Sequence, residues 1–519
     1  MLKEAPLVET AETSVVAATS ESNILTAAKG GGVKFFGTLF VYGVRFGLAL
    51  LFARLMGAGQ YGIYSLADTT FEMLAAFAFL GLGPAMVRYI PIFVSRRDER
   101  SLWDTLQVGL GIPFMISALM GIGLFIFANP IAELAFHEPS LTSVLRIAAV
   151  GIPFWTLVSL MGAAALGFKR MEYGVLAQDI SFPLIKILLV VLLALTGLTA
   201  LKAMSAHVLG VIAGCFILFY LLNKLFRLKR PLGVGRTQTR EMFKFSLPLY
   251  ASDLITLLGN NVEILLLGAL NTAVGVGIFR VADRVSAVGN AFYSSIFVAS
   301  MPVVSELYHN DERQSLGRFY QTMTKWTFTF NLPLFLINIM FADSILAIFG
   351  ESFVAGSIAL TVLAIGNLTN ALAGICGVLV VMTGKTWLNT LNSILVLTLT
   401  LTLNLLLIPR FGVLGAAAAM ATAMTVLNLA RLTQVYVLFR FLPYNRGYLK
   451  PITAGALAAI GAYAVSNWVL VEASIINTVI NVSSLLGVYA VAIWLLGFSE
   501  EDRIVLGRIG GRLKDRFMK

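Results

Sequence analysis

The chain has 519 residues, of which 58% are hydrophobic and only 13% are charged, whereas soluble domains carry about 25% charged residues. A mean hydropathy of +0.86 excludes a water-soluble enzyme, because too little polar surface is present to cover a core of this size. The net charge of +11 is explained by the Lys and Arg residues that membrane proteins concentrate in their cytoplasmic loops, so nucleic acid is not expected as a partner.

Residues 1–28 are rich in Ala, Ser, Thr and Glu and lack the basic and apolar segments of a secretory signal peptide. We predict a disordered cytoplasmic tail there. After it, apolar segments long enough to cross a bilayer recur along the chain, and we count about 14 of them. They lie near residues 32–55, 62–87, 106–128, 143–167, 174–196, 203–226, 245–270, 275–302, 324–342, 357–382, 388–408, 412–439, 449–470 and 475–498.

Lys and Arg are distributed unevenly between the two sides of the membrane. When the N-terminus is placed in the cytoplasm, that side receives both tails, the arginine-rich loop after the second span and the linker 224–244. The opposite side receives little beyond Arg54, Lys202 and Arg410. The positive-inside rule therefore predicts a multi-pass protein of the cell (inner or plasma) membrane with both termini cytoplasmic.

One eight-residue motif occurs twice. Tyr61–Asp68 (YGIYSLAD) and Val276–Asp283 (VGIFRVAD) match at four of eight positions and lie 215 residues apart. The same offset relates Gly197 to Gly412. Because an even number of spans separates the copies, the two repeats would share one topology and be related by a pseudo-twofold axis along the membrane normal.

This duplication predicts an all-α polytopic fold of two six-helix lobes plus two extra C-terminal helices. The predicted parts are the tail 1–28, an N-lobe 29–230 (spans 1–6), a C-lobe 231–445 (spans 7–12), the extra spans 446–498 and a basic cytoplasmic tail 499–519.

No pattern in the sequence supports catalysis. Cys215 and Cys376 lie in apolar runs, and the three histidines have no partners at metal-ligand spacing. Thr383-Gly-Lys-Thr386 lacks the first glycine of a phosphate-binding loop and follows an apolar span. We therefore predict neither an enzyme nor a bound metal or cofactor.

Ionisable residues inside the spans are the candidates for function, because charges in a bilayer are costly and usually line polar cavities or pair with one another. For Asp179, Asp253 and Arg431, which lie near span ends, snorkelling to the headgroups is the alternative. The basic candidates would form a cationic substrate cavity: Arg45, Arg280, Arg284, Arg146 and Lys186. The acidic candidates would serve gating or ion coupling: Asp68, Glu72, Asp283, Asp253 and Glu263.

The first repeat carries an acidic pair, and the second a basic pair, at a similar depth. Arg280, Asp283 and Arg284 share one helical face at spacings i, i+3 and i+4, and the equivalent region of span two holds Asp68 and Glu72. We predict an ion pair between these sets at the outer mouth of the cavity, which forms when the lobes close there. Local neutralisation of the arginines by Asp283 is the alternative.

Several segments resemble the oligosaccharide flippases, also called polysaccharide biosynthesis transport proteins. Ala53–Ser65 and Gly81–Pro91 resemble the opening of that family, and Ile278–Arg284 and Leu406–Ala417 resemble its second half. The resemblance covers about residues 30–500 and implies the multidrug/oligosaccharidyl-lipid/polysaccharide exporter fold. It also implies alternating-access transport of a polyprenyl-pyrophosphate-linked oligosaccharide from the inner to the outer leaflet, for cell-surface polysaccharide biosynthesis. The expected partners are this lipid-linked substrate, membrane lipids and a polysaccharide polymerase or glycosyltransferases.

Three other functions remain open at this point. A cation-coupled multidrug exporter of the same fold would prefer acidic cavity residues, which Asp253 and Glu263 could supply. A flippase for a lipid-linked peptidoglycan precursor would share the cationic cavity and differ in cargo. A membrane scaffold for glycosyltransferases would need no buried charges.

Overall fold

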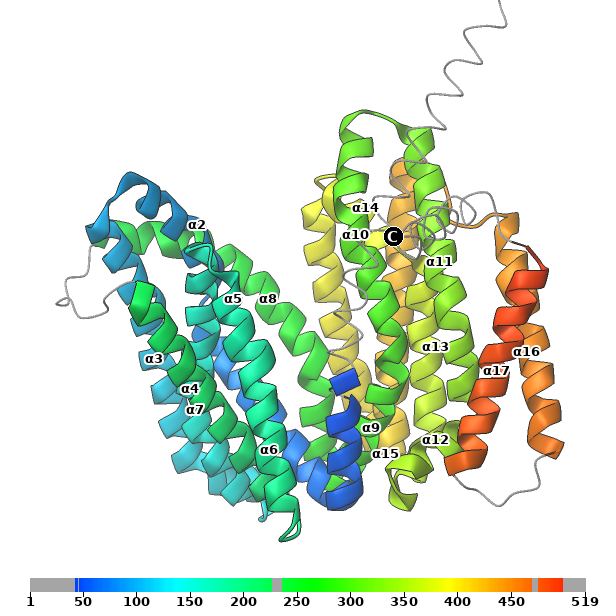
Figure 1. Ribbon diagram of the computed structural model, residues 1–519, viewed down its shortest axis with the longest axis horizontal. Coiled ribbons are helices and arrows are strands. Elements are labelled where there is room, and N and C mark those ends of the chain that lie inside the picture. The colour runs from blue at the N-terminus through cyan, green and yellow to red at the C-terminus, as the bar shows by residue number, and fades with distance from the viewer. Residues whose placement is uncertain (1–42, 45, 226–235, 469–474, 498–519) are drawn as a thin grey trace, which may run out of the picture. The chain divides into compact units, whose positions relative to one another are not determined.

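The structure is a computed structural model that describes residues 43, 44, 46–225, 236–468 and 475–497 (Figure 1). Within these ranges the chain is almost entirely helical and contains no strand. A helix satisfies its own backbone hydrogen bonds, which is why it can cross the hydrocarbon core of a bilayer. The predicted tails 1–28 and 499–519, and Arg45, lie outside the described residues.

The helices follow one another with short connections. Their bounds are Phe46–Phe79 (the first helix), α2 Leu82–Arg96, α3 Glu99–Pro130, α4 Leu141–Gly167, α5 Met171–Gly174, α6 Phe182–Ala194, α7 Ala200–Leu225, α8 Arg236–Leu270, α9 Ala273–Ser286, α10 Asn290–His309, α11 Arg313–Met340, α12 Ala342–Phe349, α13 Ser357–Ala373, α14 Cys376–Met382, α15 Thr386–Phe439, α16 Leu449–Trp468 and α17 Ile475–Leu495.

Ten described helices are long and apolar enough to cross a membrane, or up to 12 if each of two bent pairs counts as one span. The predicted count of 14 is not confirmed. Part of the difference arises because α15 contains 54 residues, a length of about 80 Å that exceeds one crossing and holds the predicted spans 388–408 and 412–439. These two parts meet at Gly412, whose φ is 53°.

The second predicted span, 62–87, is wrong at its end. The helix stops at Phe79, and Leu80 and Gly81 both take positive φ, 49° and 66°. A separate helix, α2, begins at Leu82. The left-handed conformation at Gly81 lets the backbone approach α8 closely, because a Cβ at this position would lie 2.7 Å from the carbonyl oxygen of Ser246.

The backbone breaks repeat with the offset of the sequence duplication. Gly197 and Gly412 have φ values of 79° and 53°, and Lys169 and Gly384 have values of 59° and 80°. Both pairs are 215 residues apart, and each pair ends or divides helices at equivalent places. Left-handed residues are uncommon outside turns and helix ends, so the two halves of the chain share one pattern of helices and breaks.

The chain packs as two compact units. The N-terminal unit contains residues 50–280 and 400–416, and the C-terminal unit contains residues 281–399 together with the described parts of 1–49 and 417–519. The first unit extends past the predicted N-lobe boundary at residue 230, since α8 packs against α2 and α3. The lobe boundaries themselves stay a prediction.

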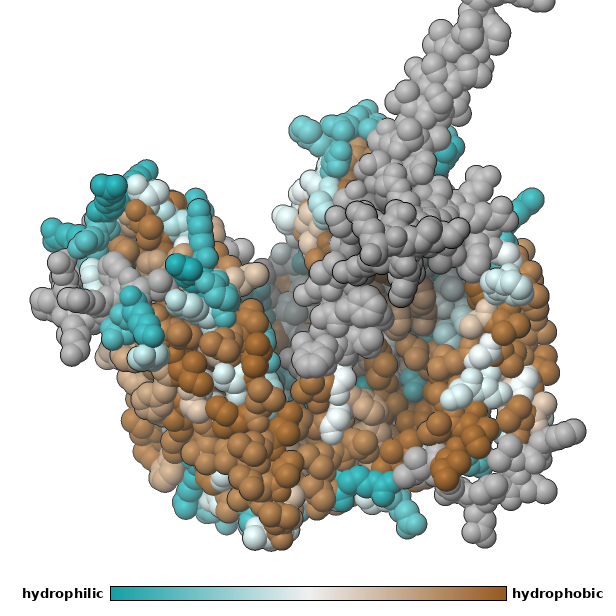
Figure 2. Space-filling model, viewed as in Figure 1, coloured by the Kyte–Doolittle hydropathy of each residue, from teal (hydrophilic) through white to brown (hydrophobic). Residues whose placement is uncertain are grey.

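Each unit has its own apolar core and an apolar outer surface. In the N-terminal unit α2, α3 and α4 meet around Leu82, Met86 and Leu160. In the C-terminal unit α10, α11 and α14 meet around Tyr320 and Leu379. Figure 2 shows hydrophobic residues along the sides of the helices, with hydrophilic residues gathered near the helix ends, as expected where the helix sides face lipid.

Candidate functional site

A buried cluster of polar and charged side chains lies inside the N-terminal unit. Lys186 Nζ donates to the Tyr64 hydroxyl at 3.0 Å and lies 3.1 Å from His207 Nδ1. His207 Nδ1 also lies 3.2 Å from Asp68 Oδ1 and 3.3 Å from Tyr64 Oη. Tyr64 donates in addition to Asp68 Oδ1 at 3.4 Å. We call these four residues the N-terminal polar cluster.

Three helices bring the cluster together. Tyr64 and Asp68 lie one turn apart on the first helix and therefore share a face. Lys186 is on α6 and His207 is on α7, and these two helices follow one another across the turn at Gly197. Since the two residues are almost equally far from that turn, they lie at the same depth.

Aromatic rings enclose the cluster. The ammonium of Lys186 lies 5.6 Å from the ring centres of Phe52 and Tyr64 and 5.8 Å from that of Phe182. The imidazole of His207 is packed against Phe71, Trp155 and Phe182 at centroid distances of 5.2, 6.3 and 5.3 Å. Ring faces attract cations, and this enclosure removes bulk water from the charged groups.

Two of the partners of His207 are charged and compete for the same nitrogen. Lys186 can only donate a hydrogen bond and the Asp68 carboxylate can only accept one, yet both lie within 3.2 Å of the same nitrogen, Nδ1. Nδ1 therefore accepts from Lys186 or donates to Asp68, but never both at once. Within the described residues, His207 Nε2 is buried and has no hydrogen-bond partner.

Two further predicted site residues act on the cluster. Arg280 on α9 is buried, with 8% of its surface exposed, and its positive charge acts on Asp68 and Tyr64. The negative charge of Glu72 acts on Tyr64. Within the N-terminal unit, the structure thus places four of the ten predicted site residues in or beside the N-terminal polar cluster: Asp68, Glu72, Lys186 and Arg280. Their predicted roles are not tested by this placement.

Three other predicted residues belong to the same unit and lie on α4 and α8. Arg146 is exposed on α4, and its guanidinium lies 5.6 Å from the Phe125 ring centre. Asp253 is exposed on α8 and lines a cavity of about 240 Å³ together with Tyr250. Glu263 is buried on the same helix.

Asp283 and Arg284, on α9, are half-buried. The described partners of Asp68 are His207 and Tyr64. The predicted ion pair between Asp68 and Arg284 therefore stays a prediction.

The two copies of the duplicated motif cross each other at glycines. A Cβ on Gly62 would overlap the carbonyl oxygen of Ala273, and a Cβ on Gly277 would overlap the carbonyl oxygen of Ala58. Gly62 and Gly277 are equivalent in the repeat, and so are Ala58 and Ala273. A reciprocal contact of this kind is the signature of a twofold axis, and small residues allow membrane helices to approach this closely.

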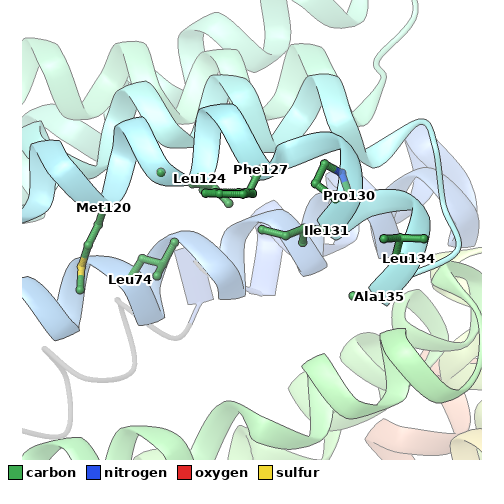
Figure 3. A pocket seen from close by; sticks show the side chains of 9 residues that line it. Leu74, Met120, Leu124, Phe127, Pro130, Ile131, Leu134 and Ala135 are labelled. Carbon is green, nitrogen blue, oxygen red and sulfur yellow. The ribbon is translucent and has the colours of Figure 1, made fainter.

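An apolar groove of about 530 Å³ runs between the first helix and α3 (Figure 3). Leu74, Met120, Phe127 and Leu134 line it, and Phe127 and Leu134 are exposed. The lining carries no charged side chain, so the groove fits hydrocarbon chains and not a polar headgroup.

Sequence comparison identifies the family. Residues 27–308, more than half of the chain, match the polysaccharide biosynthesis protein family. The chain belongs to this family. This polysaccharide biosynthesis protein is 24% identical over 396 residues to the probable low-salt glycan biosynthesis flippase Agl15 of Haloferax volcanii, a match that covers 76% of the chain and 80% of the relative. It is 23% identical over 262 residues to the capsular polysaccharide biosynthesis protein CapF of Staphylococcus aureus, covering 48% of the chain and 66% of the relative.

Solved structures share its fold. The lipid II flippase MurJ in an inward closed conformation superposes with a TM-score of 0.71 at 15% identity, covering 90% of this polysaccharide biosynthesis protein and 98% of MurJ. An inward-facing multidrug resistance transporter of the MATE family superposes with a TM-score of 0.62 at 15% identity, covering 78% and 94% of the two chains. The protein therefore has the two-lobe helical fold of these transporters, as the sequence predicts.

Proposed function

We propose that this polysaccharide biosynthesis protein is a flippase that moves a lipid-linked oligosaccharide from the inner to the outer leaflet by alternating access. The observation that carries the proposal is the combination of family and fold. The chain belongs to the polysaccharide biosynthesis family, and its fold is that of a lipid II flippase. Transport of a bulky headgroup across the bilayer needs no chemical step, so the protein is a transporter and not an enzyme.

The buried cations support a phosphorylated cargo. Lys186 and Arg280 place two positive charges inside the N-terminal unit, at 9% and 8% exposure. A (pyro)phosphate group would complement them, and a guanidinium can bind phosphate through two parallel hydrogen bonds. The lipid tail of the cargo could remain in the bilayer against exposed apolar helix sides while the headgroup crosses.

The crossing at Gly62 and Gly277 supports a gate. In the predicted topology the first turns of the repeated motif lie at the outer surface, so this contact would close the outer side. The cavity would then load from the cytoplasm. Rocking of two repeats about such a contact is how alternating access operates in folds built from internal repeats.

Purified protein in liposomes tests the function directly. We expect fluorescent lipid-linked oligosaccharide in the inner leaflet to become accessible to an external quencher within minutes, and protein-free liposomes to show no such change. Export of a cationic dye in its place would support the multidrug alternative. Transport restricted to the lipid-linked peptidoglycan precursor would support the second alternative.

Removal of the charge of Arg45 is expected to reduce transport by about tenfold, because a lone arginine in an apolar span requires an anion or a wet cavity. Arg45 lies outside the described residues. The measurement is the flipping rate of an Arg45→Ala variant relative to wild type, normalised to the amount of inserted protein. A wild-type rate would remove Arg45 from the substrate site.

The orientation of the termini and the protein partners in the cell are also part of the proposal. Both termini would face the cytoplasm of a cell membrane, which reporter fusions at each end can check. A polysaccharide polymerase or glycosyltransferase would associate with the flippase, and mild cross-linking followed by purification of the tagged protein would identify it.

A further inference from the structure

An arginine lies inside the C-terminal unit, away from the N-terminal polar cluster. Arg431 is in the second half of α15, nine residues before Arg440, where the helix ends. Side chains of a helix point back toward its N-terminus, so the side chain of Arg431 is directed away from the nearer helix end and into the span. This direction is opposite to that expected for an arginine that reaches for the nearer headgroups.

The contacts of Arg431 confirm that it points into the protein. Its guanidinium lies against Gly377 of α14, where a Cβ would be 3.5 Å from Cζ and Nη1. The same position would be 3.4 Å from the ring of Phe297 on α10. The charge of Arg431 also acts on Tyr293 of α10 and on Cys376 of α14.

No acceptor satisfies this guanidinium in the part of the chain that the structure describes. Its Nε atom is buried and makes no hydrogen bond there, and the ion pairs found among described residues involve other side chains. The two terminal nitrogens are not among the buried unsatisfied atoms. Arg431 as a whole is half-buried, so part of its side chain remains accessible.

The polar neighbours along α15 are neutral. Asn428, one turn before Arg431, donates to Thr369 at 3.1 Å and to Asn370 at 2.6 Å. Gln434, three residues after Arg431, exchanges two hydrogen bonds with Asn392 at 2.8 and 3.0 Å. These amides satisfy one another and supply no negative charge to balance the arginine.

The first repeat has no cation at the equivalent position. The repeat-equivalent residue is Phe216 on α7, which is 64% exposed. The first repeat thus builds the same span with an aromatic side chain. A charge at this position is costly in a bilayer, and neither a described carboxylate contact nor the pattern of the first repeat accounts for it.

We infer that Arg431 binds an oxyanion of the cargo, a phosphate of the lipid carrier or a carboxylate of the sugar. The inference rests on the proposed function and places the contact in the C-terminal unit. Arg is suited to both anions because its planar fork matches their geometry.

Binding to the purified protein in detergent tests this contact. The probes are polyprenyl pyrophosphate, polyprenol of the same chain length and free glucuronate. We expect an Arg431→Gln variant to bind one of the two anionic probes about tenfold more weakly than wild type, and an Arg431→Lys variant to fall in between. Arg440→Gln, which removes an exposed arginine at the end of the same helix, should bind as wild type does. The anion whose affinity falls identifies the source.

Unchanged affinity of Arg431→Gln for both anionic probes would overturn the inference and leave the proposed function standing. Failure of the wild-type protein both to bind these probes and to flip lipid-linked oligosaccharide would overturn the two together. If the variants do not fold, phenylglyoxal modification of wild-type Arg431, read by mass spectrometry, replaces them. Polyprenyl pyrophosphate or glucuronate should then slow the modification at least threefold, and no protection by either would contradict the inference.

Discussion

A Lys186→Met variant is expected to be less stable than wild type by about 3 kcal/mol, because removal of one member of a buried ionic group leaves the others uncompensated. Lys186 donates to Tyr64 and contacts His207, and its charge acts on the carboxylate of Asp68. Arg280 supplies part of the lost compensation, which places the expected loss at the low end of the range for buried pairs.

The double variant Lys186→Met/Asp68→Asn separates charge balance from packing. The Asp68→Asn substitution removes the carboxylate that the loss of Lys186 leaves uncompensated. The double variant should therefore recover about half of the lost stability. Lys202→Met is the matched control, because Lys202 is a half-buried lysine outside the cluster whose described hydrogen bonds go to Thr196 and Gly197 at the turn before α7. The apparent melting temperature in detergent is the measurement. A double variant no more stable than the single would show that the cluster is held by contacts and not by charge.

The helical architecture could be predicted because bilayers impose strong constraints on sequence. Apolar segments of sufficient length, glycines at equivalent turns and the excess of basic residues in alternate loops are all local signals. The break at Leu80 and Gly81 was missed because Leu80 takes a left-handed conformation that its own chemistry disfavours. Packing of Gly81 against α8, which the sequence does not reveal, accompanies this break.

The polar cluster shows what sequence can and cannot provide. Lys186 and Asp68 are predicted site residues because charges in spans are conspicuous. His207 has no partner at metal-ligand spacing in the sequence, because its charged partners Lys186 and Asp68 lie 21 and 139 residues away. The sequence does contain one indication that Lys186 and His207 lie at the same depth. They are almost equally far from Gly197, the turn between their two successive spans.

Substitution of Gly62 or Gly277 is expected to have the largest effect on transport. Alanine at either position would place a methyl group into the backbone of the opposing helix, at Ala273 or Ala58. The two helices must then separate, and overpacking of this kind costs about 1–3 kcal/mol. We expect the flipping rate to fall at least about tenfold in each single variant, since the closed crossing is lost from the transport cycle.

The equivalence of the two glycines gives a sharper test. Once one methyl group has pushed the helices apart, the second meets less resistance, so the effects of Gly62→Ala and Gly277→Ala should be far from additive in the double variant. Gly111→Ala serves as the control, because a Cβ on Gly111 has nothing within 4 Å and should leave transport unchanged.

A cysteine reporter can show on which side the crossing opens. Thr69 is fully buried on the same helix as Gly62, so a Thr69→Cys variant lacking Cys215 and Cys376 should react slowly with a maleimide that does not cross membranes. Addition of Gly62→Ala should make it react faster when the reagent is applied to the outside of intact cells, because the crossing would close the outer side in the predicted topology. Faster reaction only from the cytoplasmic side would place the gate on the other face, and wild-type transport by Gly62→Ala would mean that the transport cycle does not need the closed crossing.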